Sequence, residues 1–228
     1  MSVFDRRMVR ARRDRAAPPL AEADLLVRAP ATSIADRLED VNRRFPRALD
    51  LGCHGGEVAS AIRGLKGVEW IACCDLSPGF AARSADTVGA AALAADEELL
   101  PFADAAFDLI VSGLSLHWVN DLPGALIQIR RSLVPDGLFL GSMLGGETLT
   151  ELRQAWLRAE AEIEGGAGPR VSPFADVRDA AGLLQRAGFA LPVADVDELT
   201  VTYEDPIRLM RDLRAMGEMQ IVVDCDAL

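Results

Sequence analysis

Several residue types that often build active sites are scarce in this sequence of 228 residues. It contains two histidines, His54 and His117, which excludes a histidine-rich metal site, and a single lysine, Lys66. The four cysteines form no C-x-x-C pair, so we expect buried thiols in a reducing compartment and neither disulfides nor zinc. No window approaches the roughly 18 apolar residues that a membrane-spanning helix requires, and we expect no secretory signal.

Negative charge dominates the chain, whose formal net charge is −11. Because an acidic protein is repelled by phosphate backbones, we expect no nucleic-acid partner. The positive charge gathers in an arginine-rich segment, residues 6–15, which an acidic residue interrupts. We interpret this segment as a surface helix that closes over a site or docks a partner, in preference to a mitochondrial transit peptide. The expected location is the cytoplasm of a bacterial-type cell, or the mitochondrial matrix in a eukaryote, and peripheral membrane association is left open.

Short apolar segments alternate with helical patterns through the middle of the chain. Strands are expected at residues 48–51, 68–74, 90–95, 107–112 and 138–143. Helices are expected at 32–44, with Ser33 as N-cap and Pro46 as the breaker, and at 58–67, 78–87 and 123–133. This alternation predicts an α/β fold, in which a doubly wound, mostly parallel sheet carries helices on both faces.

The strongest local signal for a ligand site is the glycine-rich turn after the first expected strand. Asp50 lies at the end of that strand, residues 52–56 (Gly-Cys-His-Gly-Gly) form the turn, and a helix follows. A turn in this place lets the backbone approach a ligand and aims helix N–H groups at it. Asp75 closes the next strand, where ribose hydroxyls would need an acceptor, and it is equally suited to cap the following helix.

The turn does not suit a nicotinamide cofactor. It departs from G-x-G-x-x-G, because His54 stands two residues after Gly52 and neither Gly55 nor Gly56 supplies the third glycine. The carboxylate of Asp50 suits a positively charged ligand better than a pyrophosphate. S-adenosylmethionine carries an ammonium and a sulfonium group and no phosphate, so it is the expected cofactor.

Residues 48–56 resemble the first motif of class I methyltransferases, which have a Rossmann-like fold. Asp75 matches the ribose-binding acid of that family, and residues 95–102, then 107–108, resemble its third motif and the strand after it. Residues 135–137 (Pro-Asp-Gly) match the turn into strand five. By this resemblance Asp96 binds the adenine amino group, with Glu97 beside it. The implied cofactor-binding residues are Asp50, Gly52, Cys53, His54, Gly56, Asp75, Leu76, Asp96, Glu97, Ser112 and Leu114.

A narrower resemblance extends over nearly the whole chain. Residues 4–6 (Phe-Asp-Arg), 115–123, 145–149 and 216–218 (Met-Gly-Glu) are similar to the mitochondrial complex I assembly factor 5 family and its bacterial relatives. The mitochondrial member of that family is regarded as an arginine hydroxylase acting on a complex I subunit. Malonyl-carrier-protein methyltransferases are similar mostly in the fold motifs. His54 departs from the fold's motif, which usually has glycine there, so its side chain either crowds the methionine moiety or points out of the turn.

The sequence pattern, and for the final hairpin the resemblance to the methyltransferase fold, sets expectations for the C-terminal third. Helices are expected at 148–163 and at 174–187, the second ended by Gly188, and residues 193–203 alternate as in a strand. The fold normally ends in an antiparallel hairpin, and residues 221–223 are short for its last strand, so we expect the hairpin to be incomplete. Three regions are expected: a basic helical arm at 1–45, an S-adenosylmethionine-binding Rossmann-like core at 46–145, and a helical insertion with a shortened strand region at 146–228.

His117 and Trp118 follow the fourth strand, at the carboxyl edge where ligands bind in such sheets. His117 suits a general base or a group that orients substrate, and Trp118 suits an apolar wall; both also suit simple packing under the next helix. Hydroxylation requires oxygen activation, for which His54 and His117 with Asp50 or Asp75 resemble a non-haem iron site. We expect no metal, because the same space should hold the adenosyl ligand.

The sequence therefore predicts an enzyme that binds S-adenosylmethionine and methylates, or otherwise modifies, a protein or small-molecule substrate. Methyl transfer follows from the fold, whereas arginine hydroxylation follows only from the narrower resemblance. A non-catalytic alternative is an assembly factor that binds a subunit of respiratory complex I. Methyl transfer depends mainly on aligning the reacting atoms, which explains why no catalytic constellation stands out.

Overall fold

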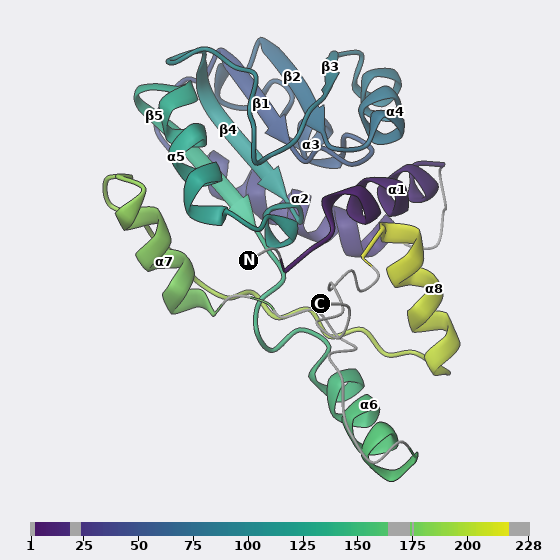
Figure 1. Ribbon diagram of the computed structural model, residues 1–228. Coiled ribbons are helices and arrows are strands. Elements are labelled where there is room, and N and C mark those ends of the chain that lie inside the picture. The colour runs from purple at the N-terminus through teal and green to yellow at the C-terminus, as the bar shows by residue number, and fades with distance from the viewer. Residues whose placement is uncertain (1–2, 19–23, 164–173, 175, 219–228) are drawn as a thin grey trace.

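A five-stranded parallel sheet forms the centre of the computed structural model, which describes residues 3–18, 24–163, 174 and 176–218 (Figure 1). Its strands, in the order β3-β2-β1-β4-β5, are β1 (Arg47–Leu51), β2 (Trp70–Asp75), β3 (Ala91–Ala94), β4 (Phe107–Gly113) and β5 (Leu133–Ser142). The order reverses between β1 and β4, as in a doubly wound sheet. The predicted α/β fold class is therefore confirmed.

Helices cover both faces of this sheet. The helices of the described residues, not all of which lie on the sheet, are α1 (Arg6–Ala16), α2 (Asp24–Glu39), α3 (Glu57–Ile62), α4 (Pro78–Val88), α5 (Leu122–Ser132), α6 (Thr150–Ile163), α7 (Val177–Arg186) and α8 (Pro206–Met216), with short 3-10 turns η1 (Leu65–Gly67) and η2 (Leu116–Trp118). Helix α6 extends away from the sheet (Figure 1). Residues of α2, α3 and α4 pack in one hydrophobic cluster, and residues of α5 and α7 pack in another on the opposite face. No helix in the described part of the chain is long and apolar enough to cross a bilayer.

The central strands are buried because both faces of the sheet are covered. Leu49, Leu109 and Ile110 have no exposed surface, and the burial of each such side chain contributes about 1.5–3 kcal/mol. Successive residues point to opposite clusters: Leu109 joins the α2–α4 side and Ile110 the α5–α7 side. Continuous apolar runs of this kind made the strands easy to recognise in the sequence.

The strand expected at 193–203 is not formed. This segment has no regular structure, and Val193 and Val196 are 83% and 66% exposed. A strand needs a neighbour to pair its backbone, and among the described residues β5 forms the edge of the sheet with no strand beyond it. Residues 221–223, the other expected hairpin strand, lie outside the described residues.

Several expected element ends were wrong. Ser33 is not an N-cap: it lies inside α2, which begins at Asp24, tolerates Pro30 and ends at Glu39, before Pro46. The helix expected at 58–67 ends at Ile62, because Gly64 adopts a φ of +77° that continues no helix. Residues 135–137 (Pro-Asp-Gly) do not precede β5 but form an irregularity inside it, where the pairing with β4 shifts register.

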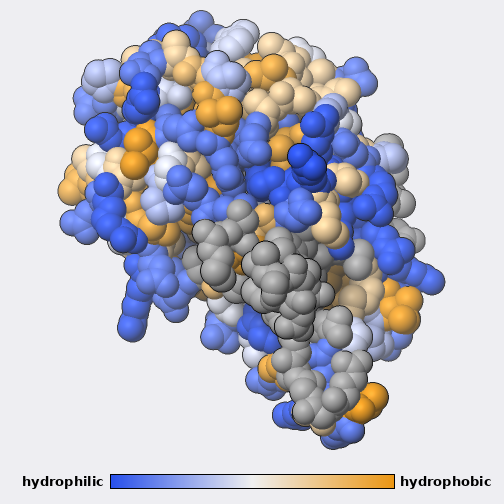
Figure 2. All heavy atoms as spheres, in the orientation of Figure 1, coloured by the Kyte–Doolittle hydropathy of each residue, from blue (hydrophilic) through white to orange (hydrophobic). Residues whose placement is uncertain are grey.

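The arginine-rich N-terminal segment forms α1, in agreement with the helix expected there. It packs against α4 and α8, and Figure 1 shows α1 in purple lying next to the carboxyl edge of the sheet with α8 in yellow beside it. On the face of the molecule shown in Figure 2, hydrophilic residues predominate and hydrophobic ones lie in smaller groups among them. The carboxyl ends of β1, β2 and β4 therefore meet beneath a basic helix.

Candidate functional site

The glycine-rich turn after β1 is held against the end of β2. The N–H groups of Gly52 and Cys53 both donate to the carbonyl oxygen of Cys74, at 2.7 and 3.0 Å. Gly52 has a φ of +69°, and a Cβ atom at this position would collide with the side chain of Ser115. Both the conformation and the close approach require glycine. The turn thus brings the chain after β4 directly over the end of β1.

Asp75 is fully buried at the end of β2, where its carboxylate collects backbone donors. Oδ1 accepts from the N–H of Ser77 at 2.8 Å, and Oδ2 accepts from the N–H of His54 at 3.1 Å. Asp75 is not the N-cap of α4; that position belongs to Ser77, whose hydroxyl accepts from the N–H of Phe80. The carboxylate therefore ties the glycine turn to the start of α4 and faces the carboxyl edge.

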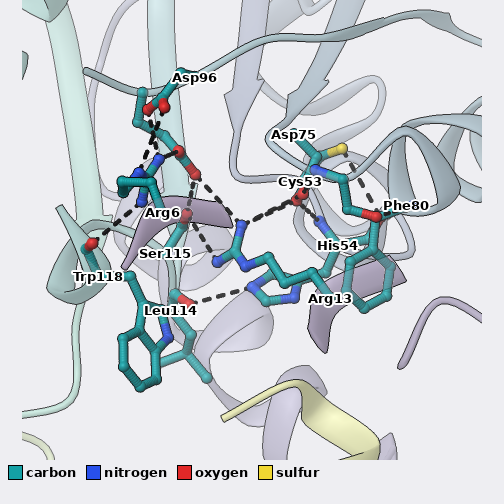
Figure 3. A network of polar contacts seen from close by, with 12 residues as sticks. Arg6, Arg13, Cys53, His54, Asp75, Phe80, Asp96, Leu114, Ser115 and Trp118 are labelled. Carbon is teal, nitrogen blue, oxygen red and sulfur yellow. Dashed lines mark hydrogen bonds and ion pairs between the residues drawn. The ribbon is translucent and has the colours of Figure 1, made fainter. Parts of the chain in front are cut away.

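Arg13 reaches from α1 into the middle of these acids, as Figure 3 shows. Its Nη1 lies 3.3 Å from Asp75 Oδ2 and 3.3 Å from Glu97 Oε1, and its Nη2 donates to the hydroxyl of Ser115 at 3.0 Å. Only 1% of this arginine is exposed. Arg13 was not among the site residues predicted from the sequence, because it comes 62 residues before Asp75.

Arg6, seven residues earlier on the same helix, binds the neighbouring acids. Its Nη2 lies 2.5 Å from Asp96 Oδ1 and also pairs with Glu97, while its Nη1 donates to the carbonyl oxygen of Trp118 at 3.1 Å. Burial alone would raise the pKa of Glu97, but the charges of Arg13 and Arg6 and the Ser115 hydroxyl hold it below its usual value. Glu97 is thus a buried, ionised carboxylate at neutral pH.

Asp50 lies in β1 and is fully buried. One carboxylate oxygen accepts from the N–H of Ala59 in α3 at 2.9 Å, and the other has no hydrogen-bond partner among the described residues. Burial raises the pKa of Asp50 well above its usual value. The side chain therefore anchors the start of α3 and holds a free acceptor beneath the turn.

His54 points into the site and not out of the turn. The imidazole is 6% exposed, its Nε2 lies 3.2 Å from the carbonyl oxygen of Leu114, and its ring meets Phe80 edge-on at 5.2 Å. The backbone of His54 has a φ of +46°, a region that glycine adopts more easily. The departure from the fold's usual glycine thus places a ring against the loop after β4.

The remaining predicted cofactor residues divide between the site and the core. Leu76 packs with Phe4, Val9 and Trp118, and Leu114 packs with Met216. Cys53 lies 3.3 Å from the hydroxyl of Ser84 and belongs to the hydrophobic cluster on the α2–α4 side, away from the acids. Ser112 is fully buried, and Gly56, with a φ of +88°, is the N-cap residue of α3.

His117 and Trp118 share one carboxylate, that of Glu218. Glu218 Oε2 lies 2.8 Å from His117 Nε2 and accepts from the indole N–H of Trp118 at 2.9 Å. All three residues are buried. Glu218 was missing from the predicted site residues because α8 brings it from 101 residues away. The only signal in the sequence was its place in the Met-Gly-Glu segment.

The two histidines do not converge on a metal site in the described part of the chain. The imidazole of His54 is hydrogen-bonded to the carbonyl oxygen of Leu114, and that of His117 to the carboxylate of Glu218. Among the described residues no three histidine, cysteine, aspartate or glutamate side chains are grouped so that they could hold an ion.

Comparison with known proteins agrees with this geometry. Residues 49–141 match the family model described as "Methyltransferase domain". A structure of the Trm112 methyltransferase activator of Haloferax volcanii in complex with a methyltransferase is 17% identical, covers 90% of this chain and 93% of that chain, and has a TM-score of 0.65. The fold and the methyltransferase domain define a class I methyltransferase-like protein.

Curated relatives narrow the class. Over 221 residues the chain is 45% identical to the mitochondrial arginine-hydroxylase NDUFAF5 of Danio rerio. The matched region covers 96% of this chain and 68% of that protein. The chain is 36% identical over 218 residues, 94% of this chain, to a malonyl-[acyl-carrier protein] O-methyltransferase of Halorhodospira halophila, of which it covers 72%. The chain belongs to the methyltransferase-fold family that includes the NDUFAF5 arginine hydroxylases. It spans about two thirds of the length of these hydroxylases, 68% in Danio rerio and 64% in Homo sapiens.

Proposed function

We propose that this chain binds S-adenosylmethionine at the carboxyl edge of β1, β2 and β4 and modifies a protein or small-molecule substrate there. The observation that carries the proposal is the convergence of Asp75, Asp96 and Glu97 around a glycine turn, all at one sheet edge. Carboxylates accept from hydroxyl and amino groups, which the adenosyl ligand supplies, and would repel a phosphate. This set of acceptors therefore fits the cofactor.

Each acid has a role in this proposal. Asp75 would accept from the ribose hydroxyls, as the family resemblance implies, and Asp96 with Glu97 would face the adenine. The unpartnered oxygen of Asp50 would become a charged acceptor beneath the turn when a cationic ligand binds, because a nearby positive charge favours the ionised carboxylate. Arg13 would exchange its contacts with Asp75 for the carboxylate of the methionine moiety, because it is the buried guanidinium next to the turn.

When bound, the cofactor supplies an electrophilic methyl group on a sulfonium. The residues of this chain would contribute by orienting the reactants and by excluding water under α1, not by covalent chemistry. Methyl transfer is the reaction that the fold and the malonyl-[acyl-carrier protein] O-methyltransferase relatives support. His117 would orient the substrate, and Trp118 would line its apolar wall.

Arginine hydroxylation is the second candidate reaction. It is favoured by the 45% identity to arginine hydroxylases across 96% of this chain. By that resemblance the substrate would be a protein, such as a subunit of respiratory complex I. A non-catalytic assembly factor would bind the same subunit through the same surface without modifying it. The corresponding location is the mitochondrial matrix in a eukaryote or the cytoplasm of a bacterial-type cell. The mass of the product distinguishes the two reactions, because a methyl group and an oxygen atom add different masses to the substrate.

Calorimetric titration with S-adenosylmethionine tests the cofactor assignment. We expect micromolar binding by the chain and a loss of affinity of about tenfold or more in Asp75→Asn, because a charged acceptor is removed. Asp108→Asn is a matched control: Asp108 pairs with Arg47 at the opposite end of the sheet. Absence of binding by folded protein would reject the cofactor, and equal losses in both variants would reject the role of Asp75.

A further inference from the structure

Helix α1 covers the three acids to which the proposed function assigns the cofactor. Arg13 contacts Asp75 and Glu97. Arg6 contacts Asp96 and also Glu97 (Figure 3). Beneath the helix, Asp75 is 0% exposed and Glu97 is 1% exposed. A ligand as large as an adenosyl group therefore cannot reach these two carboxylates while α1 is docked.

Little apolar burial holds this helix in place. Of its 11 residues, all of them described, only Val9, Arg13 and Ala16 are buried, and one of these three is charged. A helix of this length is only marginally stable by itself in water. Segments with few buried apolar contacts open locally at a low free-energy cost. Undocking of α1 is thus an accessible local opening of the fold.

Two sets of polar contacts fasten α1 outside the cofactor acids. Near its C-terminal end, Asp14 Oδ1 accepts from the hydroxyl of Ser77 at 2.5 Å and from the N–H of Gly79 at 3.2 Å, where α4 begins. Just before its N-terminal end, the side chain of Asn120 accepts from the N–H of Phe4 at 2.8 Å and donates to its carbonyl oxygen at 3.1 Å. These contacts hold the helix over the carboxyl edge without using the acids themselves.

We propose that α1 is an autoinhibitory gate of the cofactor site. In the docked state Arg6 and Arg13 occupy the acids, and the adenosyl ligand enters only after the helix moves away from the carboxyl edge. Asp14 is the latch of this gate, because it holds the docked helix without contacting those acids. The association rate of the ligand then scales with the fraction of chains in which α1 is undocked. This inference rests on the proposed function, since the gated ligand is the cofactor proposed there.

A reversible crosslink tests the gate in the whole chain. A Cβ atom at Gly79 would lie 2.9 Å from the Cβ atom of Ala17, which is the C-cap residue of α1. Disulfides join Cβ atoms about 3.5–4.5 Å apart, so a small shift lets the double variant Ala17→Cys with Gly79→Cys form one. The link fixes the helix one turn beyond Arg13 and keeps it docked.

Association of S-adenosylhomocysteine with the immobilised chain is then measured by surface plasmon resonance. We expect the oxidised double variant to associate about tenfold more slowly than the wild type, or slower still, because its gate stays shut. Reduction of the disulfide should restore the rate. Each single variant is a matched control and should be unaffected by the oxidant, because Cys53, Cys73 and Cys74 are buried.

Asp14→Ala should act in the opposite direction and raise the association rate about fivefold or more, since the docked state loses hydrogen bonds. Amide hydrogen exchange within α1 should rise by the same factor, because both measurements report the undocking of this helix. Asp104→Ala, at a 69% exposed side chain paired with Arg131, is the matched control and should change neither rate. If the crosslinked chain does not fold, the comparison of these two variants still decides the matter.

Three outcomes would overturn the gate. Association with the crosslinked chain at the wild-type rate would show that the ligand enters past the docked helix. Faster exchange in Asp14→Ala without faster association would separate undocking from ligand entry, and unchanged exchange would mean that Asp14 is no latch. Absence of S-adenosylhomocysteine binding by the wild type would instead reject the proposed function, so the two failures are distinguishable.

Discussion

The guanidinium of Arg13 takes two of the four acceptor positions on the carboxylate of Asp75. Arg13 Nη1 lies 3.4 Å from Oδ1 and 3.3 Å from Oδ2, whereas the N–H groups of Ser77 and His54 take the other two positions at 2.8 and 3.1 Å. Charge-assisted bonds are usually 2.7–2.9 Å long, so the arginine contacts are loose ones. Ribose hydroxyls can bind Asp75 only when Arg13 gives up these contacts.

This exchange predicts opposite effects of Arg13→Met on two ligands. S-adenosylhomocysteine has a carboxylate for Arg13 and should bind about tenfold more weakly or worse. Methylthioadenosine lacks the amino-acid moiety and should bind as well as to the wild type, or better, because Asp75 is no longer blocked. Calorimetry with both ligands measures the difference.

Arg13→Lys supports the interpretation of that experiment. Lysine keeps the positive charge near Asp75 and Glu97 but lacks the planar fork of the guanidinium group. The affinity of this variant for S-adenosylhomocysteine should therefore lie between those of the wild type and Arg13→Met. Thermal unfolding of all variants checks that the chain still folds when the buried acids have lost Arg13 as a partner. Equal weakening of both ligands by Arg13→Met would show that Arg13 supports the site as a whole and does not bind the carboxylate.

Gly52→Ala should abolish cofactor binding and lower stability, because its Cβ atom would collide with Ser115. Gly64→Ala is the matched control: Gly64 also has a positive φ, +77° against +69°, but no atom lies within 4 Å of its added Cβ. Both variants suffer the conformational cost of about 1–2 kcal/mol that a side chain meets at a positive φ, and only Gly52→Ala suffers the collision. Urea unfolding and calorimetry should therefore separate them, and equal losses would contradict the close approach.

The parts of the site that are local in sequence could be predicted, and the parts that depend on distant helices could not. Gly52 and Asp75 were placed correctly at the carboxyl edge, because a strand followed by a turn or an acid fixes their positions within a few residues. Arg13 and Glu218 come from α1 and α8, and no periodic pattern says which edge those helices meet. Whether the predicted residues bind the cofactor stays a prediction.

In the fold too, elements with a local sequence signal could be predicted and those that depend on distant partners could not. Apolar runs predicted all five parallel strands, and in β1, β2 and β4 burial on both faces leaves a continuous signal. The strand expected at 193–203 failed although its residues alternate, because alternation cannot supply a pairing partner. Instead Arg37 holds this segment through Asp195 and Asp197, at 2.7 and 2.9 Å. Exposed ion pairs of this kind contribute about 1 kcal/mol or less and leave no pattern in the sequence.

Glu97→Gln should destabilise the chain at neutral pH by about 3 kcal/mol, because Arg6 and Arg13 lose a shared buried partner. The pKa of Glu97 is lower in the folded state than its usual 4.5. The carboxylate therefore stabilises the fold above that value, and the contribution fades as pH falls through the lower folded pKa. Urea unfolding at several pH values should show the gap between wild type and variant closing on the acid side. Glu69→Gln, at an exposed pair, should show no such gap.

Asp50→Asn should act in the opposite direction and raise stability. Burial raises the pKa of Asp50 well above its usual 3.8, so the ionised form opposes folding. That penalty is absent below the unfolded pKa, grows as pH rises, and is complete above the folded pKa. The amide keeps an oxygen for the Ala59 N–H and removes the charge, so the variant should gain about 1 kcal/mol or more at pH near 8 and little at pH near 4.

The same substitution should weaken binding of S-adenosylmethionine, because Asp50 would become ionised beside a cationic ligand and an amide cannot. Methylthioadenosine has neither sulfonium nor ammonium and should bind the variant as it binds the wild type. A gain in stability coupled to a selective loss for the cationic ligand would show that this carboxylate is kept for binding at the expense of folding. A stability gain that is the same at both pH values would contradict the raised pKa, and equal weakening of both ligands would mean that Asp50 acts only by anchoring α3.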